Sequence, residues 1–254
     1  MLKLIIALII CFNIITAWAV WVFKGKFKVH TWTNYDAPPS AKKAILLSGF
    51  RNQPDVAFSL INFSNCRQVI YLCYSNFGLN MRQATYQLQE LYEKNKYADV
   101  FAISLGAKIA QSAGIKRSTL IDPCICPDAI CEPYRQMFKK KAIIYGALKV
   151  ILGWLAFIPV IPVEKPTEHG IAMGPVRYSL ALLADQMCCI GYGEPKIKGS
   201  YKTTLVLSKY DGLLDNEYIM KAFREAYIIM IPAGHADTLA NPEPYKKALE
   251  SLLE

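Results

Sequence analysis

The sequence predicts an α/β fold, in which a mostly parallel central sheet is flanked by helices. Short apolar and β-branched runs, typical of buried strands, recur at residues 44–47, 68–73, 99–103, 118–121, 203–208 and 226–232. An amphipathic helix is expected at 81–96 and a closing helix at 242–253. This alternation favours a single α/β domain, and 254 residues are enough for its core.

The first 23 residues are expected to form a hydrophobic helix that crosses a membrane. No charged residue occurs from Leu4 to Phe23, and a helix of that length, at about 1.5 Å per residue, spans about 30 Å of hydrocarbon. A cleaved signal peptide is the alternative, because Ala17-Trp18-Ala19 offers a small-x-small cleavage site. Segment 1–23 is therefore assigned as a transmembrane anchor or a signal peptide.

The charges that flank this segment predict its orientation. Lys24, Lys26 and Lys28 follow it, whereas only Lys3 and the terminal amine precede it. By the positive-inside rule, a retained anchor places the rest of the chain on the cytoplasmic side of the membrane. Export is the alternative.

The stretch after the run at 99–103 predicts a sharp turn with a serine at its tip. Ser104 and Gly106 follow the run, and small residues continue at Ala107 and Ala110. This order indicates a buried strand, a tight turn and a helix packed closely behind it. The free N–H groups and positive dipole end of such a helix would point at a reacting group, so Ser104 is a candidate nucleophile.

Two later strands end next to residues that suit a serine nucleophile. The run at 203–208 is followed by Asp211 and then Asp215, and the run at 226–232 is followed by His235. Of the three histidines, only His235 follows a predicted buried strand. Asp215 competes with Asp211 as the acid, but its position also suits the N-cap of a helix that starts at the next residue.

The turn, with these two residues, resembles the α/β-hydrolase family. The family's nucleophile elbow reads G-x-S-x-G, and this chain has Ala102-Ile103-Ser104-Leu105-Gly106, with alanine in place of the first glycine. The family's catalytic residues follow in the chain order Ser, Asp, His. The resemblance therefore implies that Ser104 is the nucleophile, Asp211 the acid and His235 the general base.

The same resemblance implies an oxyanion hole made of two backbone N–H groups. The run at 44–47 leads into Ser48-Gly49-Phe50, where the family usually has His-Gly-x. Phe50 and Leu105 are then the residues whose backbone N–H groups hold the oxyanion. Ser48 in place of the histidine is a second departure from the family pattern.

The resemblance also sets the expected domain division. Residues 24–43 are assigned as a linker with an edge strand at 27–32, and residues 44–254 as the α/β-hydrolase domain. From about 124 to 198 the alternation stops, and a helical cap is expected there. Its apolar centre, 142–163, is expected to be a buried cap helix, a lid that also dips into the bilayer, or a second transmembrane span.

Composition narrows the choice of partners. The net charge is +9, yet no arginine-rich patch with interleaved exposed aromatics occurs, so no nucleic-acid partner is expected. Lysines gather beside apolar segments, as at 139–141, which suits an anionic membrane surface as a partner, and a merely solvated basic face is the equally open alternative.

Cysteine usage predicts reduced thiols and no metal. Seven cysteines lie beyond the N-terminal segment, an odd number that cannot form a complete set of disulfides. Cys124, Cys126 and Cys131 have no fourth ligand nearby, so neither a metal nor another cofactor is expected.

The sequence thus leads to a hypothesis of a membrane-anchored serine hydrolase. It would cleave an ester-like bond of a small or lipophilic substrate through an acyl-enzyme. Two alternatives remain open: a catalytically inactive hydrolase-fold binding protein at the membrane, and an acyltransferase that uses the same serine.

Overall fold

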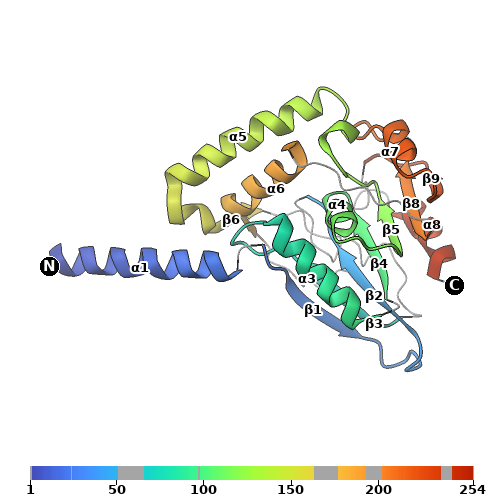
Figure 1. Ribbon diagram of the computed structural model, residues 1–254, viewed down its shortest axis with the longest axis horizontal. Helices are drawn as coiled ribbons and strands as arrows, with labels where there is room; N and C mark the ends of the chain where they lie inside the picture. Colours follow the sequence, from blue (N-terminus) through green and yellow to red (C-terminus); the bar gives the residue numbers. More distant parts are fainter. Residues whose placement is uncertain are drawn as a thin grey trace.

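The structure is a computed structural model that describes residues 2–23, 25–50, 66–96, 98–162, 177–192, 202–235 and 242–253. Among these residues, seven strands form one sheet in the order β1-β3-β2-β4-β5-β8-β9 (Figure 1). Their bounds are β1 (Lys28–Thr33), β2 (Lys42–Leu47), β3 (Cys66–Cys73), β4 (Asp99–Ile103), β5 (Ser118–Ile121), β8 (Thr203–Ser208) and β9 (Tyr227–Ile231).

The sheet is parallel except at one edge. Strand β1 pairs antiparallel with β3, whereas every other neighbouring pair in the sheet is parallel. The predicted edge strand and the mostly parallel sheet are therefore confirmed. Strand β2 begins at Lys42, two residues before the predicted run. The prediction missed this start because Lys42 and Lys43 are exposed and polar and so carry no apolar signal.

Both faces of the sheet are buried. Ile45 and Leu47 point into the cluster that also holds residues of α3 (Met81–Lys94) and α4 (Leu105–Ser112). Ala44 and Leu46 point the other way, into the cluster with residues of α8 (Glu243–Leu253). Because alternate residues face different but equally apolar layers, the strands read as continuous hydrophobic runs in the sequence.

The described part of the predicted cap is a helical layer with a small sheet. It contains η1 (Pro127–Ala129), α5 (Tyr134–Leu152), η2 (Gly153–Phe157), β6 (Pro159–Pro162), β7 (Arg177–Ser179) and α6 (Leu180–Tyr192). Helices α5 and α6 pack together, and an ion pair of 2.7 Å between Lys149 and Asp185 joins them. Residues 163–176 and 193–198 of the predicted cap lie outside the described residues.

The apolar centre of the cap is not one buried helix. Helix α5 begins at Tyr134 and ends before Gly153, whose φ of +53° is a conformation that favours glycine, and the chain continues into η2 and β6. Only Phe138 and Ala142 of α5 are buried, and Val150 and Ile151 are exposed. Hydropathy alone could neither place the end of the helix nor show which side it turns to solvent.

Helix α1 (Leu2–Phe23) forms over the predicted N-terminal segment and projects from the rest of the molecule (Figure 1). Its Phe12 ring meets the Trp154 ring of η2 edge-on, with centroids 4.8 Å apart. Across the described residues, no helix combines the length and the apolar character needed to span a membrane. The predicted transmembrane anchor and the alternative of a second span in the cap are therefore not supported.

Candidate active site

Ser104 lies at the tip of a strained turn between β4 and α4. Its φ of +48° and ψ of −110° are unusual for a residue with a side chain. A hydrogen bond of 2.9 Å from its backbone N–H to the carbonyl of Ile121 holds the turn against the end of the neighbouring strand β5. The predicted sharp turn is thus present, with the serine at its tip.

Gly106 lets the helix after the turn lie directly on β2. A Cβ at this position would come within 2.7 Å of the carbonyl oxygen of Ser48 and 2.9 Å of the Cβ of Leu47. Any larger residue would therefore push the turn away from the strand. At the position of the missing first glycine, by contrast, the methyl group of Ala102 is accommodated fully buried within the core.

The loop after β2 packs against the serine. A Cβ built on Gly49 would lie 3.1 Å from the Cβ of Ser104, so this backbone passes immediately beside the serine turn. Phe50 follows, and Leu105 begins α4 directly after Ser104. Of the two residues predicted to form an oxyanion hole, Leu105 thus lies at a helix start, where free backbone N–H groups favour negative charge, and Phe50 follows the glycine that packs beside the serine.

A tyrosine from the end of a neighbouring strand holds this loop. The hydroxyl of Tyr74, at the end of β3, donates a 2.9 Å hydrogen bond to the carbonyl of Ser48. Burial raises the pKa of Tyr74 well above its ordinary value, so the hydroxyl remains a donor. The hydroxyl oxygen of Ser48 itself is buried with no hydrogen-bond partner among the described residues.

The structure brings Ser104, His235 and Asp211 together from three separate loops. The Oγ of Ser104 lies 3.4 Å from Nε2 of His235, and Nδ1 of His235 lies 2.7 Å from Oδ2 of Asp211. The side chain of Asp211 is fully buried, and that of His235 is 19% exposed. Ser104 is 6% exposed, so the three groups form a polar cluster with limited access to water.

Backbone contacts fix the two loops that carry Asp211 and His235. The other carboxylate oxygen of Asp211 accepts the backbone N–H groups of Leu213 and Leu214 at 2.8 and 2.9 Å. The backbone N–H of Tyr210 donates to the carbonyl of Ala233 at 3.0 Å, which joins the two loops directly. Asp211 is therefore oriented before any substrate arrives.

The competing acid lies elsewhere. Asp215 accepts the backbone N–H of Tyr218 at 3.0 Å and forms the N-cap of α7 (Asn216–Ala222). This capping role is the one that its position in the sequence suggested.

The sequence did not point to Asp122, which lies beside the cluster. It follows β5 directly and has a φ of +41°. Its buried carboxylate accepts the backbone N–H and the hydroxyl of Ser208, both at 2.7 Å, and its Oδ2 lies 3.0 Å from the hydroxyl oxygen of Tyr245. A possible signal was its place at the carboxyl end of a strand next to β4, the edge at which parallel sheets gather functional residues.

The residues described include one group with the spacing of a metal site, formed by Asp122, Asp211 and His235. One ligand atom from each lies within 4.8 Å of the others. All four carboxylate oxygens of the pair already have partners within the protein. The three residues are therefore better explained as a hydrogen-bonded network than as ligands that await an ion.

Buried groups near the elbow link it to the cap. Lys108, one turn after Ser104, donates to the carbonyl of Cys189 in α6 at 2.5 Å, and burial lowers the pKa of its amine. Burial also raises the pKa of the Cys124 thiol to about 12, so Cys124 is no rival nucleophile at neutral pH. All eight cysteines are free thiols.

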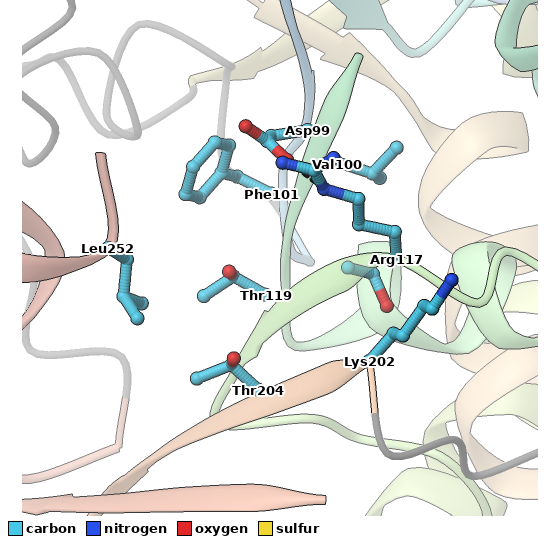
Figure 2. Close-up of a pocket in the computed structure, with 9 residues that line it drawn as sticks. Asp99, Val100, Phe101, Arg117, Thr119, Lys202, Thr204 and Leu252 are labelled. Carbon is cyan, nitrogen blue, oxygen red and sulfur yellow. Dashed lines mark ion pairs between the residues drawn. The ribbon is translucent and has the colours of Figure 1, made fainter. Parts of the chain in front are cut away.

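A separate hollow lies at the other end of the central strands, away from Ser104. It has a volume of about 130 Å³ and is lined by residues at the amino ends of β4, β5 and β8 (Figure 2). An ion pair of 2.6 Å between Arg117 and Asp99 crosses it. The cluster around Ser104 lies at the carboxyl ends of the same strands, so this hollow is not part of the candidate site.

Comparison with known proteins supports the architecture. No family model and no curated protein matches the chain. A soluble variant of monoglyceride lipase from Saccharomyces cerevisiae has a TM-score of 0.58 at 14% identity, covering 89% of this chain and 90% of that one. Two more solved structures are similar.

The first is a monoacylglycerol lipase from Paleococcus ferrophilus, with a TM-score of 0.53 at 14% identity, covering 90% of this chain and 98% of its own. The second is a hydrolase from Oleispira antarctica, with a TM-score of 0.55 at 14% identity, covering 90% of this chain and 94% of that one. The sheet order, the serine turn and these similarities show that this chain has the α/β-hydrolase fold.

Proposed function

We propose that the protein is a serine hydrolase that cleaves an ester-like bond through an acyl-enzyme. The observation that carries this proposal is the pair of contacts that links Ser104 to His235 at 3.4 Å and His235 to Asp211 at 2.7 Å. The first contact is longer than an ideal hydrogen bond. Such contacts often tighten only when substrate is bound.

The proposed reaction follows from the order of these contacts. Asp211 holds the proton of His235 on Nδ1, which leaves the Nε2 lone pair facing Ser104. His235 takes the hydroxyl proton as Ser104 Oγ attacks the carbonyl carbon, and the backbone N–H groups of Phe50 and Leu105 stabilise the oxyanion. His235 then protonates the leaving alcohol, and the same ring activates the water that releases the acid.

The surroundings of the serine favour a lipophilic substrate. The ring of Phe50 meets the ring of Phe138 in α5 edge-on, with centroids 6.1 Å apart, so the cap presents an apolar surface beside the proposed oxyanion hole. Two of the similar structures described above are lipases of acylglycerols. An acyl ester is accordingly the substrate class proposed for this chain.

A fluorophosphonate probe tests the proposal directly. Only a serine activated by a nearby base reacts with this probe at an appreciable rate. We expect a single adduct on the full-length protein, mapped by peptide mass spectrometry to Ser104. Absence of an adduct would support the inactive binding protein instead. In a separate product analysis with added alcohol, transfer of the acyl group to the alcohol in place of water would support the acyltransferase.

We further propose that the protein associates with an anionic lipid surface. Large apolar side chains are exposed along α1, as at Ile9 and Ile14, and on α5, where Val150 is 81% and Ile151 77% exposed. The ring contact between Phe12 and Trp154 brings α1 to the end of this α5 surface. Contiguous exposed apolar surface marks interaction sites, and the net charge of +9 favours an anionic partner.

Vesicle sedimentation measures this association. The double variant Val150→Asp/Ile151→Asp should reduce binding to phosphatidylserine-containing vesicles about tenfold or more, because a carboxylate at the lipid interface is costly. Gln136→Asp, at an exposed polar position of the same helix, adds one negative charge and serves as the control. Equal binding by the double variant and the control would contradict the proposal.

A further inference from the structure

The loop that carries His235 rests on the C-terminal helix. The hydroxyl of Tyr245, in the first turn of α8, lies 2.9 Å from the carbonyl oxygen of Gly234, the residue directly before His235. Tyr245 is fully buried, so solvent cannot replace its hydroxyl at this carbonyl. Residues 236–241, which join the two, lie outside the described residues.

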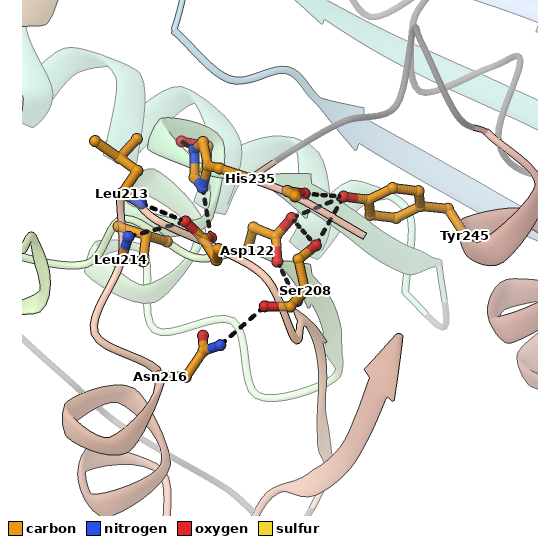
Figure 3. Close-up of polar contacts among 10 residues, drawn as sticks. Asp122, Ser208, Leu213, Leu214, Asn216, His235 and Tyr245 are labelled. Atoms are coloured by element: carbon orange, nitrogen blue, oxygen red, sulfur yellow. Dashed lines mark hydrogen bonds and ion pairs between the residues drawn. The ribbon is translucent and has the colours of Figure 1, made fainter. Parts of the chain in front are cut away.

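The Tyr245 hydroxyl is itself held from two other sides. It lies 3.0 Å from Oδ2 of Asp122 and 2.8 Å from the Oγ of Ser208, and Ser208 in turn donates to Asp122 (Figure 3). Asp122 follows β5 and Ser208 ends β8, so the hydroxyl is anchored to two central strands. Its position is therefore set by the rigid sheet rather than by α8 alone.

Backbone strain at Asp122 also indicates that this network is held rigidly. A φ of +41° is costly for a residue with a side chain and persists only where the surroundings hold it. Here the conformation directs the carboxylate to the Ser208 and Tyr245 hydroxyls, and one of its oxygens remains within 4.8 Å of both Asp211 and His235. The network thus lies directly against the proposed catalytic groups.

We propose that Tyr245, held by Asp122 and Ser208, is a positioning residue for His235. Its hydroxyl fixes the carbonyl of Gly234 and thereby the position of the next residue, His235. This position sets the distance between His235 Nε2 and Ser104 Oγ, which is 3.4 Å. This inference rests on the proposed hydrolase function. A displacement of about 1 Å at such a site can cost about 10²-fold in rate.

Tyr245→Phe removes the hydroxyl and leaves the ring. We expect kcat for a nitrophenyl ester to fall about ten- to a hundredfold with KM changed less than about twofold, because substrate contacts are untouched. Tyr71→Phe, a buried tyrosine packed in the same cluster on the α8 side of the sheet, is the matched control and should keep full turnover. A Tyr245→Phe variant with unchanged kcat would overturn the inference.

Coupling to Ser208 gives a second test. Ser208→Ala should cause a smaller loss of kcat, and the double variant should be no slower than Tyr245→Phe within about twofold, because both changes break one network. Losses that multiply would show that the two hydroxyls act independently and would overturn the network.

Hydrogen exchange separates this inference from the proposed function. Peptides covering 227–235 should exchange about tenfold faster in Tyr245→Phe than in the wild-type protein or in Tyr71→Phe, and the increase should be largest in these peptides. This readout requires no turnover. Inactive wild-type protein with faster exchange in the variant would therefore reject the hydrolase and keep the role of Tyr245 in holding the loop, whereas unchanged exchange would reject that role.

Discussion

Ser104→Ala is expected to lower kcat for a short nitrophenyl ester by about 10⁴- to 10⁶-fold. The substitution removes the proposed nucleophile, and loss of a nucleophilic serine has costs of this order in a serine protease. Steady-state kinetics on the purified full-length protein would measure the effect. The fold should persist, because the Oγ of Ser104 makes no cap contact with α4.

The matched control for this change is Ser112→Ala. Ser112 lies at the other end of the same helix and is half-buried, so the control reproduces the chemical change without approaching His235. We expect its kcat and Tm to match those of the wild-type protein. Ester turnover that survived in Ser104→Ala would assign the reaction to another nucleophile.

Asp211→Asn should reduce kcat by about 10⁴-fold while leaving the fold intact. The amide can still accept the backbone N–H groups of Leu213 and Leu214 through its oxygen, which preserves the loop. Its NH₂ group then faces Nδ1 of His235 and stabilises the wrong tautomer, with the proton on Nε2 towards Ser104. The loss should appear in kcat, and circular dichroism should be unchanged.

Asp215→Asn tests whether any nearby acid would suffice. Asparagine caps helices about as well as aspartate, so the stability of α7 should be unchanged. Because Asp215 makes its contact with Tyr218 and not with the imidazole, turnover should also be unchanged. A larger loss in Asp215→Asn than in Asp211→Asn would reverse the choice between the two acids.

The serine turn was the most predictable part of the site. A buried strand followed by Ser104 and Gly106 imposes one geometry, because the helix can approach β2 only where no Cβ intervenes. The convergence of Asp211 and His235 was predictable for a related reason, since parallel strands deliver their following loops to the same edge. The serine turn and the convergence of the two loops can therefore be predicted from short stretches of sequence, namely a buried strand and the residues that directly follow it.

The supporting groups were not predictable in this way. The hydroxyls of Tyr74 and Tyr245 reach the carbonyls of Ser48 and Gly234 across separations of 26 and 11 residues. A buried tyrosine is an ordinary core residue in a sequence, and only the assembled structure shows what its hydroxyl reaches. The exposure of the apolar side chains of α5 was also not predictable, because in the sequence they resemble the residues of a buried core helix.

The close fit of Gly106 against the Ser48 carbonyl, and of Gly49 against Ser104, has an evolutionary consequence. A side chain at Gly106 would meet the backbone of Ser48, and one at Gly49 would press tightly on Ser104, so a change at either glycine would disturb the serine turn and the opposing loop together. Lineages that descend from this protein can therefore acquire new preferences most readily through the cap, where mutation leaves this interlocked pair undisturbed.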